Sequence, residues 1–288
     1  MRHRRLTILA SACALAASCT SNDAGTAGSR ARDTATDSAV PAATVPWFDG
    51  TAPLLLAPAH TNDRALVVLA DSLAPDLEEG ALQDSGSLVR LDGSVTAVRV
   101  SVTSGSEGCV DAALQPAPAE AWGIGFVGRV PKAVRVDSIR SISRQDSTTL
   151  TAAVFRVASG IPNTPGGRFA GLPFSLVDLW RLKTAAGTTV IVATTKRQIN
   201  QEDSPLEERT LVIAEADAAG NLSLVYSSRS AGPEETVEGS ELLAALSFTN
   251  ASQLVFSHDF GEEVSYSIVE RTASGAWARR WASRRFSC

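Results

Sequence analysis

The residues of this chain best suited to acid–base chemistry are His258 and Asp259, in the segment FSHDFGEE. A histidine can take a proton from a nucleophile when a carboxylate orients its ring, as in Ser-His-Asp hydrolases. An apolar run precedes the pair, so a strand is expected to hold it at its end. The nucleophile would be a distant serine, because no Gly-x-Ser-x-Gly or Ser-x-x-Lys motif is present. The alternative is a solvated polar loop at the end of a strand.

The sequence contains no motif that is typical of metal or phosphate binding. There is no His-Glu-x-x-His, no P-loop and no EF-hand loop. Acidic pairs are expected in solvated loops, without the spacing of a calcium loop. These pairs are Glu202-Asp203, Glu207-Glu208, Glu234-Glu235 and Glu262-Glu263. We therefore expect no metal site and no cofactor.

Most of the chain has residue patterns typical of β-strands. Any functional site must therefore be positioned by strands. LVRLDGSVTAVRVSV (88–102) predicts a hairpin with Asp92-Gly93 in a two-residue turn. TTVIVATTKR and RTLVIAEA (188–216) predict two further strands, and the second predicts a hairpin with LSLVYSS (222–228) through Gly220. SQLVFSH, EVSYSIVERT and AWARRWASRRF (252–286) predict an antiparallel meander of three strands.

Two segments have helical character. QDSTTLTAAVFRVASG (145–160) places its apolar residues on one stripe, with Asp146 or Ser147 as the N-cap and Gly160 at the C′ position. SELLAALS (240–247) predicts a shorter second helix. Many strands, one or two short helices and no helix–strand alternation predict a mainly β fold of antiparallel meanders, arranged as a sandwich or propeller-like.

The C-terminal segment carries two further patterns. Residues 246–281 resemble one blade of the secreted β-propellers whose turns carry Asp-x-Asp-x-Asp-Gly calcium loops, although the loop position reads SFTNASQ and lacks the carboxylates. Trp277, Arg279 and Trp281 alternate, so a strand would place them on one face. Such a face either packs, with the arginine stem lying across it, or stacks a sugar or a base.

The first residues are typical of an export signal. Residues 1–5 are basic, and residues 6–17 form an apolar run too short to span a bilayer. The small Ser18 directly before Cys19, followed by a polar stretch, resembles the lipobox of bacterial lipoproteins. In that family a diacylglyceryl group is attached to the cysteine, and the signal is cleaved before it. The resemblance implies lipid attachment at Cys19 and a membrane anchor.

The lipobox departs from the family pattern at one position. Ala16 stands where the family prefers leucine, and Leu15 lies one position further out. Cys13 is a rival, with a shorter apolar run before it, and an ordinary secretory signal is the alternative. Thr20 follows Cys19, where an aspartate retains enterobacterial members of the family in the inner membrane. The resemblance therefore implies the outer membrane rather than the inner.

The remaining organisation follows from composition. Residues 1–18 form the signal peptide, residues 19–46 a flexible Ala/Thr/Ser-rich tether, and residues 47–288 a strand-rich globular body, with a subdivision possible near residues 160–168. Removing the signal changes the formal net charge from −5 to −8. A body this acidic is poorly suited to bind nucleic acid or an anionic lipid surface.

Export bears on the two remaining cysteines, Cys109 and Cys288. In an oxidising compartment they are expected to form a disulfide, the alternative being two buried or reactive thiols. The sequence as a whole predicts a non-catalytic lipoprotein of the bacterial envelope, with a β-rich body that binds or scaffolds an unknown protein or glycan. The alternative is an envelope hydrolase with a Ser/His/Asp site assembled from loops.

Overall fold

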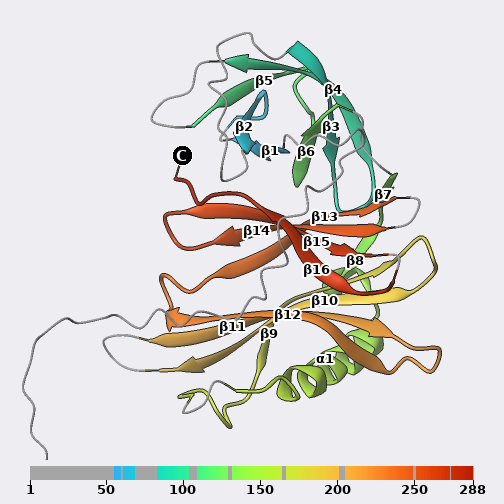
Figure 1. Cartoon of the computed structure of the whole chain (residues 1–288), viewed down its shortest axis with the longest axis vertical. Coiled ribbons are helices and arrows are strands. Elements are labelled where there is room, and N and C mark those ends of the chain that lie inside the picture. The colour runs from blue at the N-terminus through green and yellow to red at the C-terminus, as the bar shows by residue number, and fades with distance from the viewer. Residues whose placement is uncertain are drawn as a thin grey trace, which may run out of the picture. The chain divides into compact units, whose positions relative to one another are not determined.

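The computed structural model describes residues 55–59, 61–68, 83–103, 109–128, 132–163, 167–200, 205–248, 251–272 and 274–287. All of them belong to one compact unit, Ser38–Cys288. They form antiparallel strands, one α-helix and one short 3-10 helix, Ile139–Ser141 (Figure 1). The predicted mainly β fold is thereby confirmed. The predicted signal peptide, the tether, Cys19 and Cys288 lie outside the described residues.

The N-terminal strands form a closed barrel with the strand order β1-β2-β5-β4-β3-β6. The barrel closes because β6 pairs with β1 as well as with β3. Alternation along β4 places Val98, Val100 and Val102 in an apolar interior, whereas Arg99 faces outward. The six strands are β1 (Leu55–Pro58), β2 (Arg64–Val68), β3 (Gln83–Val89), β4 (Val95–Thr103), β5 (Asp111–Gln115) and β6 (Ile124–Val127).

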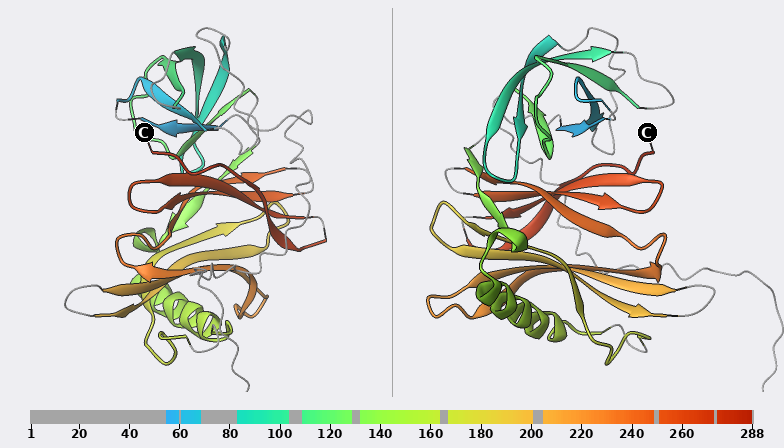
Figure 2. Two further views of the ribbon diagram at one scale, coloured as in Figure 1. Left: turned by 60° about the vertical axis from the view of Figure 1, so that its left-hand side comes forward. Right: turned by 180° about the vertical axis from the view of Figure 1, so that it is seen from behind.

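The second sheet, which we name the helix-bearing sheet, has the order β12-β11-β10-β9-β8. Helix α1 (Arg144–Ser159) covers one of its faces, as the rear view in Figure 2 shows. It packs there through Val154 and Ala158. The helix confirms the prediction for residues 145–160, but its N-cap is Ser143, whose hydroxyl accepts from the Asp146 N–H at 3.1 Å. The strands are β8 (Val136–Ser138), β9 (Ser175–Lys183), β10 (Thr189–Ile199), β11 (Leu206–Ala216) and β12 (Leu222–Pro233).

The third sheet, which we name the central sheet, has the order β16-β15-β14-β13-β7. Its strands β14, β15 and β16 are the predicted C-terminal meander. Residues 240–247, predicted as a helix, are instead strand β13, because a short apolar run buried on both faces has no period that separates strand from helix. The strands are β7 (Lys132–Val134), β13 (Gly239–Ser247), β14 (Ser252–Asp259), β15 (Val264–Arg271) and β16 (Trp277–Ala282).

Apolar side chains cover both faces of the central sheet. One face packs against the helix-bearing sheet through residues such as Phe256, Leu254 and Ile213. The other packs against the barrel, where Val255 and Ile268 join one buried cluster with barrel residues. The sequence predicted either a sandwich or a propeller-like arrangement, and the two five-stranded sheets form a sandwich.

A β-bulge separates the two tryptophans that were expected on one face. Val269 pairs with Arg279 and Ile268 with Trp281, so Arg280 is an extra residue in β16. Trp277 consequently packs between the two sheets, whereas Trp281 packs on the side of the barrel. The prediction of a common face is therefore wrong, and the two indoles do not form one stacking platform.

The predicted hairpins are present with turns slightly longer than expected. Between β3 and β4, the Arg90 N–H donates to the Ser94 carbonyl and the Gly93 N–H to the Arg90 carbonyl. Gly93 has φ of 84°, as has Gly220 in the turn between β11 and β12. This left-handed conformation favours glycine, which explains the positions of both residues.

Candidate functional site

The structure places His258 inside the sandwich rather than in a solvated loop. It lies near the end of β14, is 6% exposed and projects from the face of the central sheet that covers the helix-bearing sheet. Its cross-strand partners are Ser240 on β13 and Ser265 on β15. The polar residue at the end of an apolar strand is thus part of the buried interior.

Three side chains surround the imidazole of His258 within hydrogen-bonding distance. Its Nδ1 lies 2.9 Å from Glu238 Oε1 and 3.0 Å from Ser240 Oγ. Its Nε2 lies 2.6 Å from Ser267 Oγ on β15. Burial raises the pKa of Glu238, but the hydrogen bond and charge of His258, with Arg279 and Arg285, hold it below its ordinary value. The carboxylate, imidazole and hydroxyl follow the order of a serine-hydrolase triad.

The surroundings of this chain of groups are closed. Ser267 is 1% exposed and lies in the middle of β15, between strands on both sides. The cavity beside Glu238 and Ser240 measures about 10 Å³, which is room for about one water molecule. The contacts therefore satisfy buried polar groups, and the Ser267 hydroxyl is closed off from the solvent.

Asp259, the predicted partner of His258, points elsewhere. Its Oδ1 accepts from the Gly261 N–H at 2.8 Å and so closes the turn between β14 and β15. Consecutive residues of a strand face opposite sides, so Asp259 does not share the side of the imidazole. Sequence reasoning identified the histidine but missed Glu238, Ser240 and Ser267, which come from two other strands and a preceding loop.

Charged residues on β10 and β11 form a second network in the same interior. Glu207 is fully buried and accepts from Lys196 Nζ at 2.6 Å and from Arg209 Nε at 2.9 Å. Burial raises the pKa of Glu207, but the hydrogen bonds and charges of Lys196 and Arg209 hold it below its ordinary value. The expectation of solvated turns is wrong for Glu207 and Glu208, because each carboxylate is paired within a long strand.

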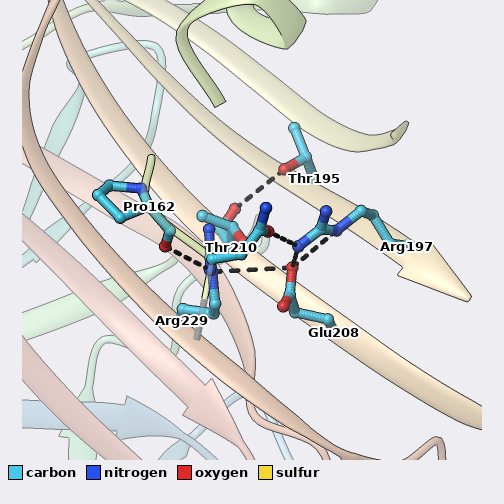
Figure 3. Close-up of polar contacts among 7 residues, drawn as sticks. Pro162, Thr195, Arg197, Glu208, Thr210 and Arg229 are labelled. Atoms are coloured by element: carbon cyan, nitrogen blue, oxygen red, sulfur yellow. Dashed lines mark hydrogen bonds and ion pairs between the residues drawn. The ribbon is translucent and has the colours of Figure 1, made fainter. Parts of the chain in front are cut away.

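The neighbouring carboxylate, Glu208, faces the helix side of the same sheet (Figure 3). Its Oε1 accepts from Arg197 Nε at 2.9 Å and lies 3.7 Å from Arg229 Nε. Arg229 also donates to the Pro162 carbonyl at 3.0 Å, and Arg197 donates to Asn163 Oδ1 at 2.8 Å. These contacts fasten the chain just after α1 to the sheet. The strands before and after residues 160–168, β8 and β9, pair in that same sheet.

The outer face of the barrel carries a cavity of about 570 Å³. Ser85, Arg99 and Gln115 lie side by side there, because Arg99 is the cross-strand partner of both other residues. Among the described residues, Arg99 has no ion-pair or hydrogen-bond partner, and its side chain is exposed. The lining comprises Asp84, Ser85, Arg99, Val100, Ser101, Ala113 and Gln115. We name this the barrel groove.

The structure gives one observation on the predicted disulfide. The sulfur of Cys109 lies 3.5 Å from the carbonyl oxygen of Ser287. Cys288 itself lies outside the described residues.

Three further observations concern binding and membranes. In the part of the chain that the structure describes, no three His, Cys, Asp or Glu side chains gather as a metal site. Within the same residues, no helix is long and apolar enough to cross a bilayer. Comparison with known proteins finds no matching family model, no matching curated protein and no matching solved structure.

Proposed function

We propose that this chain is a non-catalytic, lipid-anchored protein of the bacterial envelope whose β-rich body binds a protein or glycan. The observation that carries the binding role is the barrel groove. Its volume of about 570 Å³ falls in the range of ligand sites, roughly 300–1,000 Å³. Arg99 offers it an exposed guanidinium that has no partner among the described residues.

The anchor in this proposal is a diacylglyceryl group on Cys19, followed by the tether of residues 19–46. The body is too acidic to be attracted to an anionic bilayer by charge, so a lipid supplies the attachment. Intact-mass measurement of the mature protein tests this. We expect a chain that begins at an acylated Cys19, and a Cys19→Ala variant that leaves the membrane fraction. A mature chain with residues 1–18 attached would refute the anchor.

The outer membrane is the proposed destination, because Thr20 rather than an aspartate follows Cys19. Separation of the two membranes by density tests this directly. We expect the wild-type protein in the outer-membrane fraction. Its recovery in the inner-membrane fraction would contradict the assignment without touching the lipid anchor.

A disulfide between Cys109 and Cys288 completes the proposal. The contact between Cys109 and Ser287 supports it, because Ser287 directly precedes Cys288 in the sequence. Such a bridge would stabilise the fold by about 2–4 kcal/mol by restricting the unfolded chain. Peptide mapping without reductant should recover the linked peptides. Recovery of both cysteines as free thiols from the envelope would refute the bridge.

The binding role is tested by affinity capture of the full, lipidated chain from envelope membranes. We expect one stoichiometric partner, lost with Arg99→Gln and retained with Arg64→Gln. Arg64 is a suitable control because it lies on β2 of the same barrel, is 51% exposed and is outside the groove lining. Equal capture by both variants would remove the groove from the proposal.

A second candidate function, an envelope hydrolase, is favoured by one observation, the Glu238–His258–Ser267 chain of contacts. It ranks lower because the adjacent cavity of about 10 Å³ admits no substrate. A fluorophosphonate probe, which labels activated serines, separates the two functions. Labelling of Ser267, together with ester or peptide turnover lost in Ser267→Ala, would establish the hydrolase instead.

A further inference from the structure

The barrel groove contains a row of three hydrogen-bonding side chains from three neighbouring strands. Ser85 on β3, Arg99 on β4 and Gln115 on β5 are lateral neighbours in register. Directly opposed residues of adjacent strands lie about 5 Å apart, so the row spans about 10 Å. It places a hydroxyl, a guanidinium and an amide in one line, and all three can donate to the same ligand.

The centre of this row is suited to an anion. A guanidinium presents parallel N–H groups that match the two oxygens of a carboxylate or of a phosphate. Among the described residues, no carboxylate pairs with Arg99, so a ligand would not have to displace an internal partner. The two neighbours of Arg99 in the row are Ser85 and Gln115. Both are neutral and add hydrogen-bond donors beside the guanidinium.

Asp84 is the second charged residue in the lining of the groove, and its charge would affect which anions bind there. Asp84 is the cross-strand partner of the inward-facing Val100, but its Oδ1 accepts from the Ser85 N–H at 2.6 Å and from the Ser85 hydroxyl at 3.3 Å, which holds the carboxylate at the groove. Among the described residues, its Oδ2 makes no hydrogen bond and can accept an N–H from a ligand. A fixed negative charge penalises a dianion such as phosphate more than a monoanion. The same Asp84 oxygen favours binding of a ligand that carries N–H donors next to its carboxylate.

We propose that the barrel groove binds a peptide through a carboxylate held by Arg99, with Asp84 accepting from a peptide N–H or ammonium group. This inference rests on the proposed binding function and names its ligand class. A peptide fits both charges, because amide or ammonium donors accompany each of its carboxylates. The carboxylate has two sources, the C-terminus or an Asp or Glu side chain, which share the chemistry that Arg99 recognises.

The test is a titration of the full chain in detergent, followed by NMR or thermophoresis. The probes are trialanine, trialanine amide, and an acetylated, amidated Ala-Glu-Ala, with glucuronate and inorganic phosphate as competing classes. We expect at least one peptide acid to bind, and Arg99→Gln to weaken it about tenfold or more while Arg64→Gln leaves it unchanged. Binding of trialanine but not its amide identifies the C-terminus. Binding of the blocked Ala-Glu-Ala identifies a side chain.

Asp84→Asn provides a second readout that a purely structural role of Arg99 would not produce. It should weaken the peptide acids and strengthen phosphate, because it removes the negative charge that discriminates between them. Glucuronate or phosphate binding that depends on Arg99, without peptide binding, would overturn the ligand class and leave the binding function standing. Trialanine that binds no better than its amide, together with no binding of the blocked Ala-Glu-Ala, would also overturn it. If no probe binds and envelope capture is also insensitive to Arg99→Gln, the binding function itself fails.

Discussion

Replacing Ser267 by alanine decides whether its contact with His258 is structural or catalytic. The Ser267 hydroxyl lies 2.6 Å from His258 Nε2, and the two residues are 1% and 6% exposed. Loss of a buried hydrogen bond costs about 0.5–1.5 kcal/mol, and leaving the imidazole nitrogen buried without a partner brings the total to about 1–3 kcal/mol. We therefore expect Ser267→Ala to lower the free energy of unfolding by that amount.

The assay is urea unfolding of the full chain, with Ser265→Ala as the matched control. Ser265 lies two residues earlier on β15, faces the same side and is 9% exposed. Among the described residues it makes no side-chain hydrogen bond. With a urea dependence of about 2–3 kcal/mol per molar, Ser267→Ala should lower the midpoint by roughly 0.3–1.5 M. Ser265→Ala should change it much less.

A free energy of unfolding that Ser267→Ala leaves unchanged or raises would indicate a catalytic site. Active-site residues are commonly held at a cost in stability, so their removal is neutral or stabilising. A Ser267→Ala variant as stable as the wild-type protein, or more stable, would refute the structural interpretation. A covalent adduct of a fluorophosphonate at Ser267 would refute it independently.

Three other substitutions probe the fold and its charges. Glu208→Ala should cost about 3–5 kcal/mol in urea unfolding, because its side chain is 6% exposed and its removal leaves the buried Arg197 without a carboxylate partner. The control Glu120→Ala, at a 74% exposed side chain, should cost under about 1 kcal/mol, and equal losses would contradict the argument. Gly123→Ala should cost about 1–3 kcal/mol, because a Cβ there would lie 2.6 Å from a backbone oxygen of β13. Gly232→Ala, with no atom within 4 Å, should cost little, and similar values for the two variants would argue against a tight contact. The pKa of Glu207 is lower in the folded protein, so its contribution is present above the ordinary value of 4.5 and is lost as the pH falls below it. Glu207→Gln should therefore flatten the acid limb of a stability–pH curve, and an unchanged limb would show that this carboxylate is not responsible.

Local signals in the sequence were sufficient to predict the elements whose conformation depends on residues close by in the chain. Glycine at positive φ marks the turns at Gly93 and Gly220, and helical spacing marks residues 145–160. Both signals arise within a few residues, where backbone sterics and a single apolar stripe decide the conformation. The hairpins and the helix were predicted for this reason.

Features set by distant contacts were predicted less well. Residues 240–247 form a strand because sheets cover both of its faces, and this burial is invisible in a short apolar run. The bulge at Arg280 reverses the side on which Trp281 packs, and no residue pattern in WARRW announces an extra residue in the register. Closure of the barrel depends on the pairing of β1 with β6, which lie far apart in the sequence.

The candidate sites also combine residues that local sequence could identify with partners that depend on distant strand pairing. His258 was identifiable because histidine is rare in this chain, but its partners depend on pairing between β13, β14 and β15. One signal could have led to Ser267: EVSYSIVERT alternates, and its serines fall on one face of a strand with apolar residues on the other. A polar stripe on a strand in the middle of a meander indicates a buried polar cluster. No comparable signal marks the barrel groove, whose row of side chains exists only through the strand register.

The register also indicates that the proposed binding at the barrel groove would leave the fold undisturbed. The barrel contacts the central sheet mainly through β1, β2 and β6, with Leu55 and Phe126 in the shared apolar cluster. The groove row lies on β3, β4 and β5, which are consecutive neighbours in the strand order and complete the circle on the other arc. Of these three strands only β3 also enters the shared apolar cluster, through Val89 at the end away from Ser85, so docking and ligand contact use largely separate parts of the barrel. Because the backbone of Arg99 is paired in the sheet on both sides, ligand binding would need no rearrangement of the strands, and its main entropic cost would be the lost rotamer freedom of the exposed Arg99 side chain.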